Sequence, residues 1–259
     1  RKQCRAAPAG AALFHSFLFS DFVKKILFAL AFVVGVGGTA AAQGLSYGVK
    51  VGANYANVWG KNALDGYKYK AGFLGGLAVN YAFNDFASLQ VEALYSNKGF
   101  TLDDAEVNTT ANGVTTKYKY EGKFNINYVD IPILAKIDAG PIFFELGPQA
   151  GIRTDSNFST DTKMKVGDDV VAESFTDNNS DVLPGYTKKD SKNGGIPRFD
   201  IGLVAGVGFD VAPGVSIGVR YNAGVKTLVD TKNVEAGDEP RIFNEAFQAQ
   251  VGYMFGATK

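Results

Sequence analysis

Eight charged residues are the side chains of this sequence best placed to do chemistry, because each interrupts a segment that is otherwise mainly apolar or small. They are Lys50, Glu92, Asp130, Lys136, Glu145, Arg198, Asp200 and Arg220. The carboxylates of Glu92, Asp130 and Glu145 have the chemistry of general acids and bases. The set carries both signs of charge, however, as it must if its members are to pair inside a narrow interior. We therefore predict an interior network of ion pairs rather than a catalytic site.

The residue types that most catalytic and metal sites require occur only near the beginning of the chain. The single cysteine is Cys4 and the single histidine is His15. Without them, the rest of the chain cannot form a Cys or His zinc site, a Ser-His-Asp or Cys-His pair, or a haem site with a His ligand. We predict that the protein is not an enzyme, with no catalytic residue and no cofactor.

One acidic segment, 177–181 (Asp-Asn-Asn-Ser-Asp), resembles the first ligands of a calcium-binding loop. Val182 stands where such a loop has glycine and Lys188 where it has glutamate. We interpret the segment as a solvated loop and predict no metal site.

The region before residue 43 has the pattern of a secretory signal peptide. Lys24 and Lys25 precede an apolar run at 26–36, and alanines at 40–42 form a small-residue cleavage site. We expect 1–22 to be translated upstream sequence, 23–42 the signal peptide and 43–259 a single barrel domain. The remaining 217 residues hold 21 basic and 25 acidic side chains. This balance gives no electrostatic argument for a nucleic-acid partner.

The segments that must position the eight charges alternate between apolar and polar residues, a period typical of β-strands. They lie at about 45–58, 71–83, 87–99, 124–137, 142–152, 199–211, 215–225 and 243–255. Short and long connections alternate between them, and aromatic residues stand near the strand ends, at Trp59, Phe83, Tyr95, Phe243, Tyr253 and Phe255. The pattern predicts an all-β fold: an eight-stranded antiparallel up-and-down transmembrane β-barrel with short periplasmic turns and long extracellular loops.

Three local features qualify this pattern. The segment 101–123 keeps a period of two around Asn112-Gly113, which predicts an exposed hairpin that continues two barrel strands. The apolar positions change from even to odd near 128–130, which predicts a β-bulge there. Pro132 and Pro148 should lie nearly opposite each other and weaken their hairpin, because neither can donate to the ladder. The segment 154–197 is expected to be the longest loop.

Alternation alone leaves open which face of the barrel is outside. In a secreted, lipocalin-like barrel the apolar residues would line a cavity for an apolar ligand. The polar face is rich in glycine, for example Gly48, Gly52, Gly202 and Gly206, which suits a crowded interior better than a solvated surface. We therefore expect the apolar face to meet lipid. An eight-stranded barrel is just wide enough for side chains to fill it, so the charged residues should close the lumen.

The segment 127–136, Asn-Tyr-Val-Asp-Ile-Pro-Ile-Leu-Ala-Lys, resembles a Tyr-hydrophobic-Glu/Asp-Ile-Pro-Leu-hydrophobic-Lys strand of the Bacteroidetes outer-membrane β-barrel family, often called the porin or PorT family. Segments beginning at Gly48, Phe144 and Gly218 also fit, and the resemblance covers about 44–255. It implies a barrel in the outer membrane of a Gram-negative bacterium. It implies no settled activity, although one named relative is similar to an accessory of a protein-secretion system. Asp130 stands where glutamate is common.

Together these features predict a monomeric, non-enzymatic outer-membrane protein with outer-membrane lipid around it. An envelope or extracellular protein partner would contact the loop 154–197 or the hairpin that carries Tyr118 and Tyr120, because binding residues concentrate on loops held by a rigid scaffold. A narrow channel for ions or small solutes is the alternative, and the soluble lipocalin-like barrel is the second alternative.

Overall fold

The computed structural model describes residues 44–61, 66–111, 114–166, 169–179, 195–229 and 241–256. Nine strands occupy most of this part of the chain: β1 (Leu45–Lys61), β2 (Tyr67–Ala82), β3 (Ala87–Ala111), β4 (Val114–Ala139), β5 (Ile142–Val166), β6 (Asp169–Asn179), β7 (Phe199–Ala212), β8 (Val215–Gly224) and β9 (Arg241–Phe255). None of the described residues forms a helix long and apolar enough to cross a membrane. The expected leader and signal peptide at 1–42 lie outside the described residues.

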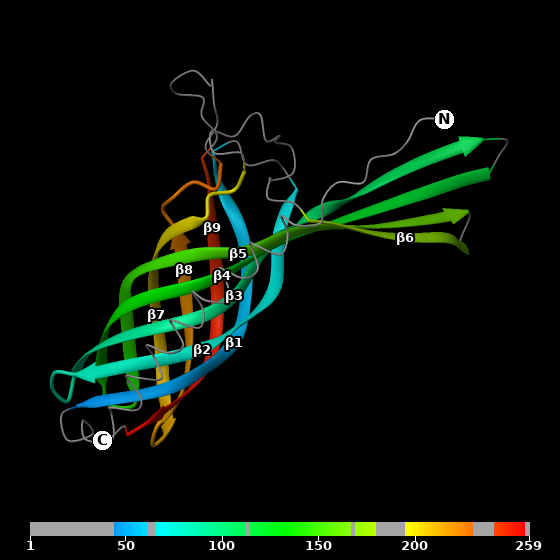
Figure 1. Cartoon of the computed structure of the whole chain (residues 1–259). Helices are drawn as coiled ribbons and strands as arrows, with labels where there is room; N and C mark the ends of the chain where they lie inside the picture. Colours follow the sequence, from blue (N-terminus) through cyan, green and yellow to red (C-terminus); the bar gives the residue numbers. More distant parts are fainter. Residues whose placement is uncertain are drawn as a thin grey trace, which may run out of the picture.

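Eight of the strands close into a barrel. Each pairs antiparallel with its neighbours in the order β1, β2, β3, β4, β5, β7, β8, β9, and β9 pairs again with β1. Short turns join β2 to β3, β4 to β5 and β7 to β8 at the end of the barrel where β1 begins and β9 ends (Figure 1). The prediction of an eight-stranded antiparallel barrel is confirmed.

The outer surface of the barrel is apolar. Burial alternates residue by residue along β7 and β9, and the outward members are large apolar side chains. Phe199, Ile201 and Leu203 of β7, and Phe247 and Val251 of β9, each expose about half of their surface. Apolar patches of this extent are rare on soluble monomers. The wall therefore suits lipid, and the lipocalin-like arrangement, which would turn these residues inward, is not favoured.

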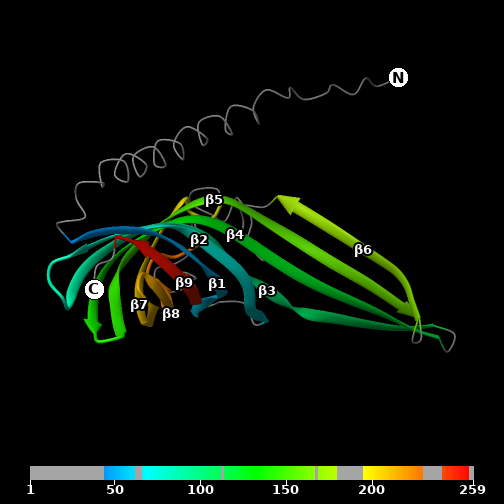
Figure 2. The same cartoon turned by 90° about the horizontal axis from the view of Figure 1, so that it is seen from below.

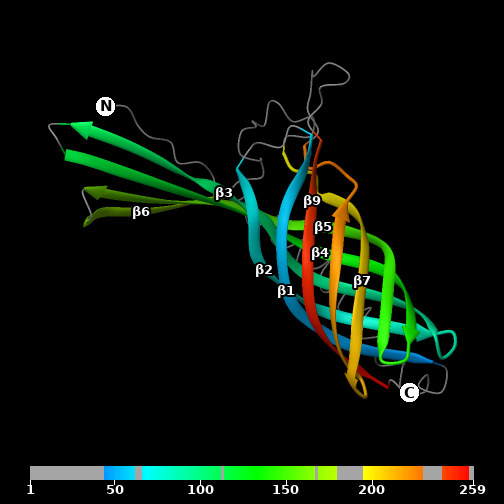
Figure 3. The same cartoon turned by 180° about the vertical axis from the view of Figure 1, so that it is seen from behind.

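Beyond one rim of the barrel, β3, β4 and β5 continue as a sheet that projects to the side, and β6 joins it by pairing with 157–166 of β5 (Figures 1–3). We call this four-stranded sheet the extension. The hairpin expected at 101–123 is confirmed as its β3–β4 part. The interpretation of 154–197 as one long loop is wrong at 154–166 and 169–179, which form β5 and β6. The polar Thr, Ser, Asn and Asp content of these residues concealed strands that are not embedded in an apolar barrel wall.

The expected bulge in β4 is also wrong in its position. Burial alternates without interruption from Gly122 to Leu134, so every even residue of this stretch faces inward. The register shift lies instead on β5, where Asn127 pairs with Asp155 and Tyr128 with Arg153. The change from even to odd apolar positions has a different cause: the inside of the barrel is itself apolar at this level. Pro132 pairs with Gln149, the residue next to Pro148, so the expected proximity of the two prolines is confirmed.

Candidate functional site: the interior of the barrel

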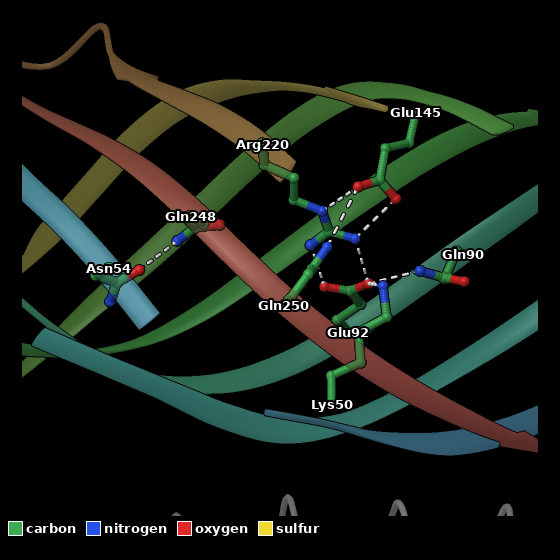
Figure 4. Close-up of polar contacts among 8 residues, drawn as sticks. All are labelled: Lys50, Asn54, Gln90, Glu92, Glu145, Arg220, Gln248 and Gln250. Carbon is green, nitrogen blue, oxygen red and sulfur yellow. Dashed lines mark hydrogen bonds and ion pairs between the residues drawn. The ribbon is translucent and has the colours of Figure 1, made fainter. Parts of the chain in front are cut away.

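A central ion cluster, formed by Lys50, Glu92, Glu145 and Arg220, crosses the lumen from β1, β3, β5 and β8 (Figure 4). Arg220 donates from Nη1 to Glu92 Oε2 at 2.6 Å and from Nη2 to Glu92 Oε1 at 2.7 Å. It also donates from Nη2 to Glu145 Oε2 at 2.8 Å and from Nε to Glu145 Oε1. Lys50 Nζ lies 2.7 Å from Glu92 Oε1. Two cations thus neutralise two carboxylates, and all four side chains are buried.

Side-chain amides fill the space around the central ion cluster. Gln90 donates to Glu92 Oε1 at 2.5 Å. Gln250 lies beside the guanidinium, and with its oxygen turned toward Arg220 it accepts from Nη2 at 3.2 Å and Nε at 2.6 Å. Further along the axis, Gln248 donates to Asn54 Oδ1 at 2.9 Å (Figure 4), and Asn54 donates to Ser96 Oγ at 2.9 Å. The donors and acceptors therefore satisfy one another across the lumen.

A second polar group lies nearer the rim where β9 begins. Lys98 Nζ is 2.8 Å from Asp130 Oδ2, and both side chains are only 2% exposed. Asn244 donates to Asp200 Oδ2 at 2.8 Å and to the hydroxyl of Tyr128 at 3.1 Å. Asp130 Oδ1 is buried without a hydrogen-bond partner. The group is therefore less completely satisfied than the central ion cluster.

An apolar cluster lies inside the barrel, above these polar groups. Its buried members come from four barrel strands (β1, β3, β4 and β9) and from the segments just before β7 and after β8: Val58, Phe100, Phe124, Ile126, Tyr128, Ile196, Leu228, Val229 and Ile242. The register places this cluster at the long-loop end, since Lys50 pairs with Gly252 near the short-turn end and Gly60 pairs with Ile242 near the other. We call it the apolar cap. Its rings stack closely, with 5.3 Å between the centroids of Phe100 and Phe124.

The structure buries six of the eight charged residues that the sequence singled out: Lys50, Glu92, Asp130, Glu145, Asp200 and Arg220. Lys136 lies at the short-turn rim, where its Nζ is 3.5 Å from Asp138 and 3.9 Å from the centre of the Phe143 ring. The assignment of Arg198 to the interior needs correction, because its side chain is exposed at the start of β7. Arg198 precedes the first residue of β7, so the alternation of inward and outward side chains along that strand does not fix its direction.

The predicted interface aromatics lie on the outer wall or its turns. Trp59 and Phe243 form a cross-strand pair with ring centroids 5.1 Å apart at the long-loop end. Tyr253 and Phe255 contact each other at the opposite end, with 4.7 Å between centroids. Tyr95 is partly exposed on β3, and Phe83 is exposed in the turn after β2.

Sequence reasoning did not assign Lys98, Tyr128 or Gln250 to the network. Lys98 could have been found by extending the inward parity of Gln90 and Glu92 along β3. Tyr128 was missed because its neighbours Phe124 and Ile126 are apolar, and apolar residues were assigned to the lipid-facing side.

This arrangement suits a closed lumen better than a reaction site. All four carboxylate oxygens of Glu92 and Glu145 contact a cation or an amide, so none is presented to a substrate. Among the described residues, no group of three or more His, Cys, Asp or Glu side chains could hold a metal ion. The side chains of 177–179, the start of the calcium-like segment, are not among those described.

No curated protein matches the chain. Among solved structures, it is similar to the attachment invasion locus protein Ail of Yersinia pestis at 13% identity, covering 81% of this chain and 98% of that one with a TM-score of 0.35. It is also similar to Neisserial surface protein A at 17% identity, covering 82% and 99% with a TM-score of 0.34. OprG of Pseudomonas aeruginosa shares 12% identity over 82% and 95%, with a TM-score of 0.28.

The comparison with protein families is decisive. The model of the outer membrane protein beta-barrel domain matches residues 41–230, which is more than half of the chain and spans β1 to β8. The closed ring of strands, the apolar outer wall and this match place the protein in the outer membrane. The chain belongs to the outer membrane protein beta-barrel domain family.

Proposed function

We propose that this outer-membrane protein is a sealed, non-enzymatic barrel that acts through its extracellular extension and loops. It serves as a rigid mount, and an envelope or extracellular protein binds the parts that project from the membrane. The protein works as a monomer, exported by its N-terminal signal peptide, in a role like that of the porin or PorT family that the 127–136 segment resembles.

The observation that carries this proposal is that two layers of buried side chains lie one above the other inside the barrel. The central ion cluster fills one level of the interior and the apolar cap fills another. An ion that entered from the outside would have to lose its water at the cap, and burying an isolated charge in an apolar environment is very costly. With both layers in place, we therefore expect the lumen not to conduct ordinary solutes.

The extension supports the second half of the proposal. β3, β4 and β5 are 25, 26 and 25 residues long, whereas a membrane-crossing strand needs only about 9–11 residues. The residues of β3, β4 and β5 beyond this length form a sheet outside the membrane and do not fold back over the lumen. Rigid scaffolds that present such segments concentrate binding function there.

A narrow channel is the alternative function, and one observation favours it. The central ion cluster consists of side chains only, which can rearrange without breaking the backbone ladder. This alternative requires the apolar cap to open as well.

A bilayer experiment separates the two functions. Purified protein in a planar bilayer should show no steady conductance, and Arg220→Ala should also stay closed because the apolar cap remains. If Arg220→Ala conducts, a side-chain gate within a channel replaces the sealed barrel. For the binding role, removal of 103–121 and 155–180 with short turns in their place should leave a folded barrel that no longer captures the cell-envelope proteins retained by the full chain. Equal capture by both forms would contradict a role for the extension.

A further inference from the structure

An acidic side chain interrupts the apolar outer wall of β9 near the long-loop rim. Between Phe243 and Val251 the outward residues of this strand are apolar except for Glu245. Glu245 lies two residues from Phe243, whose ring packs on Trp59 at the rim. Aromatic residues of this kind mark the membrane interface. The carboxylate therefore lies at the level where lipid tails give way to headgroups.

Two tyrosines from different strands hold this carboxylate in place. Tyr69 of β2 donates its hydroxyl to Glu245 Oε1 at 2.6 Å, and Tyr221 of β8 donates to Oε2 at 3.0 Å. The strands β2, β1, β9 and β8 are successive neighbours in the barrel. The side chain of Tyr69 therefore crosses over β1 to reach β9, and both oxygens of the carboxylate are fixed on the outer wall.

Aromatic rings surround the carboxylate. Tyr69 stacks on Tyr55 with 4.7 Å between the ring centroids, and its ring centroid lies 6.1 Å from that of Phe247. Tyr221 packs on Phe247 from the β8 side, at 5.0 Å. Tyr55 and Phe247 each expose about half of their surface, so the group is open toward the membrane. We call Glu245 and these four rings the tyrosine–glutamate site.

The outward positions beside Glu245 carry uncharged residues. Its cross-strand partners are Asn57 on β1 and Ala223 on β8. Lys70, the residue after Tyr69, contacts the opposite neighbour of β2, where it donates to an asparagine of β3 at 2.6 Å. The two phenolic hydroxyls provide hydrogen bonds but no positive charge. Because a charge on the lipid-facing wall of a barrel is destabilising, a cation at this site would be favourable.

A second acceptor lies beside the carboxylate. Asn57 pairs with Glu245 and has the outward parity of the exposed Tyr55 and Trp59. Its Oδ1 is buried and, within the part of the chain that the structure describes, accepts no hydrogen bond. A carboxylate and an amide oxygen both require donors. The site therefore suits a positively charged group with N–H donors and not an anion.

A primary ammonium fits this site better than a metal ion. Ca²⁺ takes about 6–8 oxygen ligands, whereas no group of three or more His, Cys, Asp or Glu side chains among the described residues could hold a metal. Aromatic faces attract ammonium groups because the ring quadrupole is negative there. An ammonium can also donate hydrogen bonds to the remaining lone pairs of Glu245.

We propose that the tyrosine–glutamate site binds the primary ammonium of a lipid headgroup, with Glu245 as its counter-ion. The carbon atoms of the headgroup lie against the rings of Tyr55 and Phe247. The acyl chains continue along the apolar wall, where Ala53 pairs with Ala249. A lipid is the occupant that this position selects, because the site is on the membrane-facing wall and leads into its apolar part. The inference is independent of whether the lumen is sealed and of what the extension binds.

Lipid titration of the detergent-solubilised full-length protein, followed by native mass spectrometry, tests this proposal. Phosphatidylethanolamine and phosphatidylcholine with the same acyl chains have the same net charge, but only the ethanolamine headgroup has N–H donors. The wild type should bind phosphatidylethanolamine about 10-fold more tightly, because hydrogen bonds to charged groups are the strong ones. Glu245→Gln should reduce this preference to less than about 3-fold. The matched control is Glu121→Gln, which removes a partly exposed carboxylate of β4 in the extension and should keep the preference.

Three results would overturn the proposal: equal affinity of the wild type for the two lipids, a preference that Glu245→Gln retains, or a preference that Glu121→Gln loses to the same extent. The first uses only the wild-type protein, so it remains decisive if a variant fails to fold, and it would leave the site to a basic side chain of a membrane partner. Failure of the sealed-lumen proposal would appear as conductance and would leave these results unchanged.

Discussion

Removal of Arg220 should destabilise the barrel more than any other single change in the central ion cluster. In Arg220→Met, Lys50 alone faces Glu92 and Glu145, so one negative charge is left uncompensated in a fully buried site. Breaking a buried ion pair by removing one partner costs about 3–5 kcal/mol. Methionine fills a similar length, so the loss reports charge and hydrogen bonds rather than a large cavity.

A second variant separates the charge imbalance from the loss of packing. Arg220→Met combined with Glu145→Gln leaves Lys50 and Glu92 as a neutral pair, so the double variant should be more stable than Arg220→Met alone. Arg198→Met is the matched control, because this arginine is exposed, and it should change stability by no more than about 0.5 kcal/mol. The assay is urea unfolding in phosphatidylcholine vesicles, followed by the mobility difference between boiled and unboiled samples in SDS gels. A wild-type-like midpoint for Arg220→Met, or a double variant that is weaker than the single, would refute the reasoning.

The remaining predictions concern the second polar group, the apolar cap and one backbone position. Asp130→Ala should lower the thermal midpoint, by less than Arg220→Met, because Lys98 keeps the nearby Asp200 as an electrostatic partner; an unchanged midpoint in a gel-shift melt would count against the network. Phe124→Ala should cost about 3–5 kcal/mol in urea unfolding, and a loss below 1 kcal/mol would mean that the cap is loosely packed. Gly99 and Gly140 both have positive φ, but only at Gly99 would a Cβ meet backbone, 1.9 Å from the carbonyl oxygen of Phe124; Gly99→Ala should therefore be the more destabilising, and equal midpoints would contradict this.

The barrel itself could be predicted from the sequence because its pattern is enforced twice. Lipid favours apolar side chains on the outside of the barrel, and the narrow lumen favours small and polar side chains on the inside. Strands such as 199–211 and 243–255 therefore alternate between the two kinds of residue. The number of strands and the alternation of short and long connections can be predicted from this pattern. The same alternation predicts the inward position of Lys50, Glu92, Glu145 and Arg220, which the structure buries.

The interior near the long-loop rim could not be predicted in the same way. There the inward side chains Phe124, Ile126 and Tyr128 are themselves apolar. Assigning every apolar residue to the lipid-facing side therefore placed these three on the wrong face, and it required a β-bulge that β4 does not have. The extension was missed for a related reason. At 160–166 and 169–174 none of the residues is buried, so no packed core imposes a period on the residue types.

Planar-bilayer conductance of the purified wild-type protein tests the central claim, a lumen closed by two stacked layers, most directly. The sample should first show a heat-dependent shift in an SDS gel, so that a closed barrel is known to be present. The account predicts a bilayer that stays at baseline over the voltage range in which the membrane itself is stable. Steady single-channel conductance from such a sample would contradict it and would mean that the central ion cluster and the apolar cap open together.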